Sequence, residues 1–318
     1  MAREVRERAV SFESESTYGT DVISGSPSAF FKVVGDSPIV SPIRTVVESE
    51  EVCATHDGIE HQSFASHNDA NFSIYLRGKE SAAGDAPLWA ALLMATGAEE
   101  TITASTSAAY EWVTYHTPSV APSMTLYEDV FYTDGTARRF VAPGQYGNLT
   151  LTAEMDTYAT IAYSGMGLFQ QGASSTASIS LPGSYDGSKP RLICRNLVVS
   201  IGGSNYALRS FDLNTNWSIE EDRSMSGSSS LDAVYLKRAS GSRMGGTLDF
   251  ADVDLFEAIL SAYGTDAQLA MTATWDDGTD TVVLSQTIQL GQYTRSGGSL
   301  GSFSVPYFVV GTSTLAFT

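Results

Sequence analysis

The sequence predicts a mostly β protein made of two similar halves. Only 17% of its 318 residues are charged, and the polar remainder is dominated by Ser, Thr and Gly. A low charge content combined with many Thr, Tyr and Phe residues is typical of strands and turns rather than of exposed helices. The chain is 42% hydrophobic, which is enough for a packed core and argues against a disordered protein.

Two short helical patterns lie far apart in the sequence and resemble each other. They cover residues 87–97 and 254–264, and a shift of 167 residues aligns Leu88 with Leu255 and the glycines that end both patterns. The first opens on Pro, the second on Asp, and both close on Gly, as helix termini prefer. Each pattern has one apolar face, so we expect two short helices that cover sheets.

Strand-like segments surround both helical patterns in the same order. Each half also contains an Asp-Gly-Thr turn, at residues 134–136 and 277–279, and Asp-Gly favours a hairpin because both residues tolerate positive φ. The first half carries an insertion at about residues 99–122. This ordered match indicates a duplicated domain. The expected strands cover residues 45–51, 72–76, 124–128 and 160–164 in the first half and 216–221, 246–250, 271–275 and 314–318 in the second.

The expected organisation follows from this duplication and from composition. Two long irregular segments, residues 53–70 and 223–243, occupy equivalent places in the halves. Such loops inside a compact domain are usually functional or disordered, and their equivalence favours function. The expected parts are an N-terminal arm at residues 1–28, a first domain at 29–169, a Ser/Gly-rich linker at 170–190 and a second domain at 191–318.

The charge and the apolar pattern limit the possible partners. A net charge of −18 disfavours nucleic-acid binding, because affinity for phosphates comes mainly from Lys and Arg. The sequence has no apolar run of 18 residues and no signal-peptide pattern. We therefore expect that the protein is made in the cytoplasm and does not insert into a membrane. Cys53 and Cys194 provide no disulfide framework.

Motifs for catalysis, cofactors and metals are missing from the sequence. No P-loop is present, and GGSLG at residues 297–301 is no hydrolase elbow because no His follows His116. The three histidines between positions 56 and 67 lack the spacing of a helical zinc pair. The acidic stretch 276–280 lacks the calcium-loop pattern and is better explained as a hairpin turn. We therefore expect no enzyme activity, no cofactor and no metal site.

Three segments of the chain resemble the tail tube (major tail) proteins of long-tailed bacteriophages. They are FESESTYGT at residues 12–20, SFDLNTNWSIE at residues 210–220 and the closing LAFT at residues 315–318. Over nearly the whole chain, the likeness lies in the architecture, that is, in the order of the predicted strands and helices. It implies two tandem tail-tube-like β-sandwich or barrel domains, each with one short α-helix.

The resemblance also implies a structural function. Such proteins form stacked rings, in which inner strands of neighbouring subunits join into a continuous barrel around a channel. Members with two fused domains form trimeric rings with pseudo-sixfold symmetry. The implied partners are further copies of the chain, the tape-measure protein, the tail terminator and baseplate proteins, with DNA only in transit. The implied location is the virion tail, assembled in the host bacterial cytoplasm. We further hypothesise that several of the excess carboxylates face the channel.

By position, the two long segments correspond to ring-stacking loops. A terminator or baseplate hub protein of related fold is an alternative, which would stop at one ring where a tube protein polymerises. A carbohydrate-binding β-sandwich protein is a second alternative, which glycan binding would favour. The expected inter-ring contact residues are His56, Asp57, His61, His67, Asp69, Arg223, Met225 and Arg238.

Overall fold

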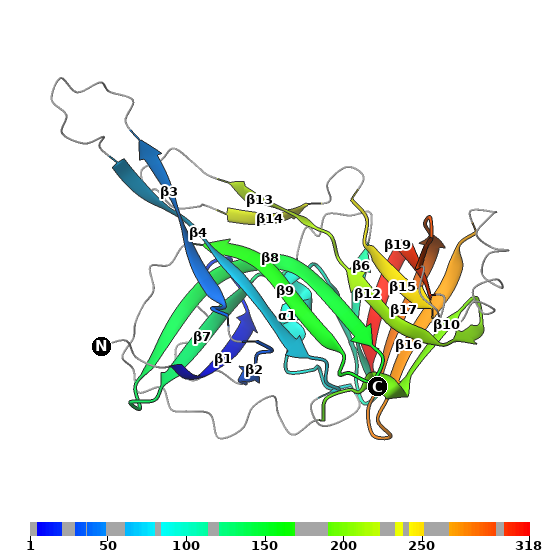
Figure 1. Cartoon of the computed structure of the whole chain (residues 1–318). Helices are drawn as coiled ribbons and strands as arrows, with labels where there is room; N and C mark the ends of the chain where they lie inside the picture. The colour runs from blue at the N-terminus through cyan, green and yellow to red at the C-terminus, as the bar shows by residue number, and fades with distance from the viewer. Residues whose placement is uncertain are drawn as a thin grey trace.

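A computed structural model of the chain is mostly β, which confirms the predicted fold class (Figure 1). In the part of the chain that the structure describes, seventeen strands belong to one antiparallel sheet, and two further strands form a separate hairpin. The described residues also contain one α-helix, α1 (Ala90–Ala95), and a short 3-10 helix, η1 (Cys194–Asn196). The structure describes residues 5–20, 29–35, 37–48, 61–79, 84–113, 121–168, 190–222, 233–237, 242–250, 267–296 and 302–318.

The strands of the first half pair in the order β3-β4-β9-β8-β7-β1-β2. The β7–β8 hairpin turns at the predicted Asp-Gly, where Gly135 has a φ of 80°. Glycine adopts this backbone without steric cost, which explains the position of the turn. The bounds are β1 (Val5–Ser14), β2 (Phe31–Lys32), β3 (Val40–Glu48), β4 (His61–Tyr75), β7 (Met124–Tyr132), β8 (Ala137–Glu154) and β9 (Thr160–Leu168).

The strands of the second half pair in the order β12-β15-β19-β17-β16-β10-β11. The predicted Asp-Gly turn joins β16 to β17, with Gly278 at a φ of 86°. The bounds are β10 (Leu197–Ile201), β11 (Ser204–Tyr206), β12 (Leu208–Asn214), β15 (Gly245–Phe250), β16 (Leu269–Asp276), β17 (Thr281–Leu290), β18 (Thr294–Ser296) and β19 (Ser302–Phe317).

The two halves therefore repeat the same order of strand pairing. β12 takes the place of β3, β15 that of β4, β19 that of β9, and β17 that of β8. This agreement supports the duplication inferred from the sequence, with one correction: residues 216–221, the predicted counterpart of 45–51, fall mainly in the separate hairpin strand β13 (Ser218–Asp222), and β12 takes that place instead. The division into separate domains stays a prediction, because strand pairs and a common hydrophobic core connect the halves.

Two strand pairings join the halves. β12 lies beside the C-terminal part of β8, from Ser210 opposite Glu154 to Asn214 opposite Thr150. β19 lies beside β6 (Ser107–Val113), which forms a hairpin with β5 (Glu99–Thr103). The predicted insertion of the first half thus extends the sheet of the second half.

The helix α1 covers the inner face of the sheet where the halves meet. Its end matches the sequence prediction: Gly97 has a φ of 87° and donates to Met94, while Ala98 donates to Leu93. This pair of bonds satisfies the last carbonyls of the helix. Trp89 is buried and packs edge-on against Phe317, with ring centroids 5.4 Å apart. The second predicted helix, at residues 254–264, lies outside the described residues.

The predicted N-terminal arm needs a correction. Residues 5–14 form β1, which pairs with β7 along its length, and Val10 and Phe12 are buried in the core. Phe12 stacks on Phe31 with centroids 4.8 Å apart. Charged residues of this segment mask its apolar positions in the sequence, but the strand satisfies its backbone groups inside the chain's own sheet.

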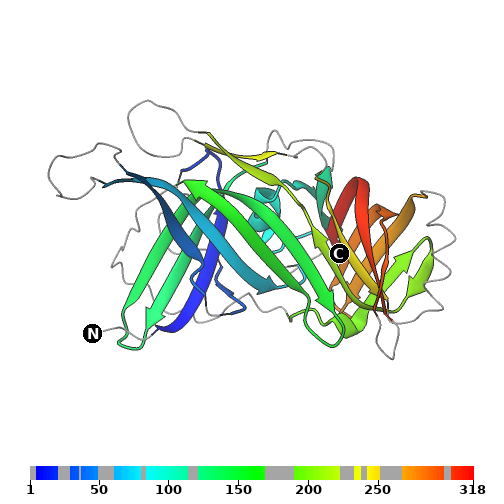
Figure 2. The same ribbon diagram turned by 45° about the horizontal axis from the view of Figure 1, so that its top comes forward.

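The two predicted long loops also need a correction, because both contain strands. β4 begins at His61 and forms a long hairpin with β3. In the second half, β13 (Ser218–Asp222) forms a hairpin with β14 (Ala233–Lys237). Both hairpins lie on one side of the molecule, at the top of Figures 1 and 2. Most of the predicted linker at residues 170–190 lies outside the described residues.

Candidate functional site

A continuous sheet with one polar face runs across the molecule. The strands β4, β9, β8, β12, β15 and β19 lie side by side, as their colours show in Figure 2. Side chains alternate between the faces of a strand, and opposite residues of paired strands share a face. One face carries apolar residues such as Ile161, Tyr163 and Leu213, which are buried in the core. The other face points to solvent.

This solvent side, called the polar face here, is built mainly from small polar residues. Across one row of the sheet Tyr75, Thr160, Thr152 and Asp212 are successive neighbours. The polar face consists of Asp69, Asn71, Ser73, Tyr75, Asn148, Thr150, Thr152, Glu154, Thr160, Ala162, Ser164, Met166, Ser210, Asp212, Asn214, Thr247, Asp249, Ser304, Pro306 and Phe308.

The polar face is acidic. Its members include the carboxylates of Asp69, Glu154, Asp212 and Asp249, and no Lys or Arg is among the residues that define it. Phosphate groups are held mainly by cations, and one cation beside this face is Arg191, which lies 4.5 Å from the centroid of the Tyr75 ring. Part of the negative charge seen in the sequence is therefore located on one continuous sheet face.

Two of these carboxylates influence each other. Burial raises the pKa of Asp212, and the nearby charge of Asp249 raises it further, against the hydrogen bonds that Thr247 contributes. Asp249 accepts a hydrogen bond of 2.6 Å from the Ser210 hydroxyl. The polar face thus concentrates negative charge at the β12–β15 pair, close to the junction of the halves.

One histidine connects the first predicted stacking segment to the strand that precedes the second. His67 of β4 lies with Nε2 3.2 Å from Asp69 and with Nδ1 2.9 Å from Glu221 of β13. Glu221 was not among the predicted contact residues, and it is the last residue of the strand predicted at 216–221, two positions before the predicted segment 223–243. The contact links the β3–β4 hairpin to the β13–β14 hairpin. His61 is the first residue of β4, opposite Glu48.

Five of the predicted contact residues cannot be placed. They lie outside the residues that the structure describes, so their proposed role stays a prediction. They are His56, Asp57, Arg223, Met225 and Arg238.

A buried carboxylate near the start of the chain was not singled out by the sequence. Glu15 accepts hydrogen bonds from the Gly19 and Gly144 amides and from two hydroxyls of the β7 region. The turn that it holds carries Tyr18, whose hydroxyl accepts the Val234 N–H of β14 at 2.8 Å. The FESESTYGT segment therefore supports the β13–β14 hairpin. The sequence gave no such signal, because all of these partners except Gly19 are more than 100 residues away in the chain.

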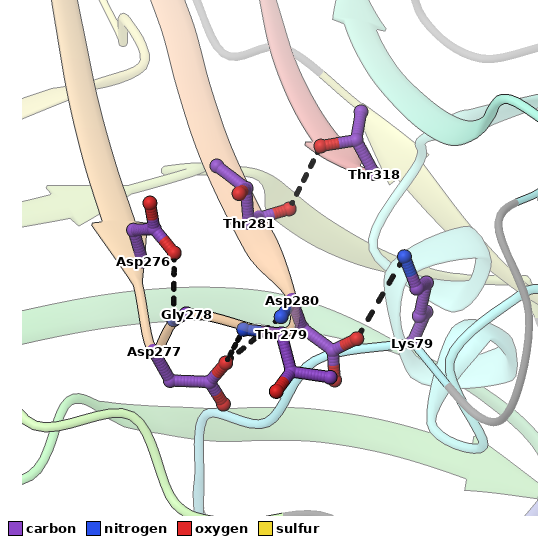
Figure 3. Close-up of polar contacts among 8 residues, drawn as sticks. All are labelled: Lys79, Asp276, Asp277, Gly278, Thr279, Asp280, Thr281 and Thr318. Atoms are coloured by element: carbon purple, nitrogen blue, oxygen red, sulfur yellow. Dashed lines mark hydrogen bonds and ion pairs between the residues drawn. The ribbon is translucent and has the colours of Figure 1, made fainter.

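The acidic stretch 276–280 is a hairpin turn, as predicted (Figure 3). Asp276 accepts the Gly278 N–H at 2.8 Å, and Asp277 accepts two further backbone N–H groups of the turn. Asp280 is buried and lies 3.7 Å from the Lys79 amine of the first half. These carboxylates bind backbone groups of the turn or pair with Lys79. The described residues contain no group of three or more side chains arranged to hold a metal ion.

No protein-family model matches the chain, and no curated protein matches it. In the described part of the chain, no helix has the length and apolar character needed to cross a membrane.

Proposed function

We propose that this protein is the structural subunit of a bacteriophage tail tube, which assembles with its own copies into stacked rings around a channel. The observation that carries the proposal is the joining of two repeated units edge to edge, through β8 and β12, into one sheet with an acidic polar face. A repeated unit that joins its neighbour by strand pairing is suited to ring closure. The role is structural rather than catalytic.

The repeat indicates how copies would join. Within the chain, β8 of the first unit pairs with β12 of the second. The strand equivalent to β8 is β17 with its continuation β18, and the strand equivalent to β12 is β3. A second copy would therefore place its β3 beside the β17–β18 end of the first. Among the described residues, β3 pairs only with β4 and β18 only with β19.

Part of the β3 edge is already occupied. The Val40 N–H donates to Glu128 at 3.0 Å, and Pro42 has no N–H to offer. Such features prevent uncontrolled pairing of an edge strand. The available donors of β3 accordingly lie beyond its irregularity at Ile43 and Arg44, toward the β3–β4 hairpin.

The polar face would line the channel in this assembly. The carboxylates scattered over this face repel a phosphate backbone, so DNA could pass without being held tightly. The same channel would hold the tape-measure protein before ejection. The two hairpins on one side of each subunit would reach the next ring, and three copies with two units each would give a pseudo-sixfold ring.

Electron microscopy of the purified protein over a concentration series tests the proposal. Long hollow tubes with a regular axial repeat are the expected result, and end-on views should have sixfold appearance with three subunits. Single rings that never stack would contradict the tube assignment and favour a terminator or hub protein. Persistent monomers that bind glycans would favour the carbohydrate-binding alternative.

The lining of the channel is tested separately by placing cations on the polar face. Tubes of Thr152→Lys with Asp212→Lys, two neighbours in the sheet, should retain double-stranded DNA in a salt-dependent manner, whereas wild-type tubes should not. Glu99→Lys on the exposed β5 strand is the matched control. Equal retention by the control tubes would show that the polar face does not line the channel.

A further inference from the structure

The side of the molecule opposite the two hairpins carries an exposed apolar group around a cavity. The cavity has a volume of about 280 Å³ and lies between the end of β8, η1, β10 and the start of β12. Its walls include the buried residues Cys194, Val199 and Phe211. In both views the end of β8 points away from the β3–β4 and β13–β14 hairpins (Figures 1 and 2).

Large apolar side chains are exposed beside this cavity. Nine such side chains are exposed in the described part of the chain, and Met155, Tyr158 and Ile193 are three of them. Met155 is 57% exposed and lines the cavity, while Tyr158 and Ile193 form a β-bridge next to it. An exposed apolar group with a concave centre is typical of a protein contact surface.

The charge of this side differs from that of the chain as a whole. Residues 191–209 contain three arginines and no acidic residue, although the protein has only 18 basic residues against 36 acidic ones. Arg195 and Arg209 line the cavity, and Arg195 is paired with Asp156 at 3.1 Å. The three arginines together with Glu154 and Asp156 carry a net charge of +1. We call this surface the basal rim: Met155, Tyr158, Arg191, Ile193, Arg195 and Arg209.

The β13–β14 hairpin presents a complementary surface on the other side. Val234 and Leu236 are buried against the body, so the alternate residues of β14 point outward. Tyr235 is 51% exposed, and Glu220 lies opposite it on β13. The three acids of β13 against Lys237 leave two negative charges on the hairpin strands. Glu220 is paired with Lys237 at 2.9 Å, so the net negative charge of these strands comes from Glu221 and Asp222, beside one exposed aromatic side chain.

We propose that the basal rim is the docking site for the β13–β14 hairpin of a second copy, with the Tyr235 ring entering the cavity near Met155. The inference rests on the proposed tube function and identifies its axial contact. Aromatic anchors in pockets, surrounded by charges of opposite sign, are the usual centre of a protein interface. A contact between opposite sides of identical chains does not close on itself, so it generates a filament.

Photo-cross-linking tests the contact directly. Benzoylphenylalanine is placed at Tyr235, and differently isotope-labelled copies are mixed so that mass spectrometry identifies links between copies. Links to residues 153–158 or 191–211 of the second copy are expected. The same probe at Ile102, an equally exposed apolar position on β5, is the control and should give no such links. Absence of links from position 235 to the basal rim would overturn the proposal.

A variant of the basal rim separates this proposal from the tube assignment. Met155→Asp combined with Ile193→Asp should raise the critical concentration for tube growth at least tenfold, whereas Ile102→Asp should leave it unchanged. Both positions are exposed, so circular dichroism should confirm an unchanged fold. Normal tubes from the double variant would refute the basal rim and leave the tube assignment intact. Cross-links to the basal rim without hollow tubes would support the contact and refute the tube.

Discussion

Replacing Glu15 with Gln should destabilise the protein strongly, although the change removes only one charge. The Glu15 side chain follows β1, and the residue is only 4% exposed. Its carboxylate accepts from the Gly19 N–H at 2.7 Å and from the Ser123 hydroxyl at 2.5 Å. It also accepts from the Thr125 hydroxyl at 2.6 Å and from the Gly144 N–H at 2.8 Å. All four contacts are donors, so the site is built for an anion.

The magnitude follows from these donors. One Gly amide bonds to each carboxylate oxygen, and a Gln side chain keeps only one oxygen. Whichever orientation it adopts, one buried backbone N–H faces the new NH₂ group and loses its acceptor. A hydrogen bond to a charged group contributes about 1.5–3 kcal/mol, and the remaining bonds lose their charge assistance. The expected loss of unfolding free energy is about 2–4 kcal/mol.

Urea unfolding followed by tryptophan fluorescence measures this loss. All four tryptophans are buried, so their emission reports on the core. With a denaturant slope of about 3 kcal/mol/M, the midpoint should fall by about 1 M. Glu99→Gln, on the fully exposed β5 strand, is the control and should shift the midpoint little. A Glu15→Gln midpoint within error of this control would refute the stabilising role of the four donors around Glu15.

Three further predictions concern the sheet and its junctions. Gly246→Ala should destabilise by at least 3 kcal/mol in urea, because the added Cβ meets the Asp212 carbonyl oxygen, whereas Gly135→Ala meets nothing and should cost about 1 kcal/mol. The raised pKa of Asp212 means that the folded protein binds its proton more tightly than the unfolded chain, so stability falls as pH rises through that pKa. Asp212→Asn should accordingly raise the melting temperature at pH 7 and not at pH 3; parallel curves would contradict this. Lys79→Met removes the cation that lies 3.7 Å from the buried Asp280 carboxylate and should lower the unfolding free energy measured in urea by about 3–5 kcal/mol, and a loss below 1 kcal/mol would exclude a structural role for the pair.

The sequence by itself determined the features that depend on neighbouring residues. The two Asp-Gly hairpins, the helix end at Gly97 and the strands around them were all predicted, because short-range hydrogen bonds and backbone preferences fix them. The duplication also emerged from spacing, and the strand pairing of the two halves supports it. Alternating apolar residues indicated strands without indicating their neighbours.

Only the tertiary structure decided how these strands are joined. An edge strand offers the same row of N–H and C=O groups to any partner, so the pairings β8–β12 and β6–β19 leave no local signal. The same holds for β1, which the sequence assigned to an arm, and for Glu15, whose donors come from its own turn and from two distant segments. The amino-acid composition likewise gives the number of carboxylates but not their positions in the fold. Their position on the polar face follows from the register of six strands, which long-range packing sets.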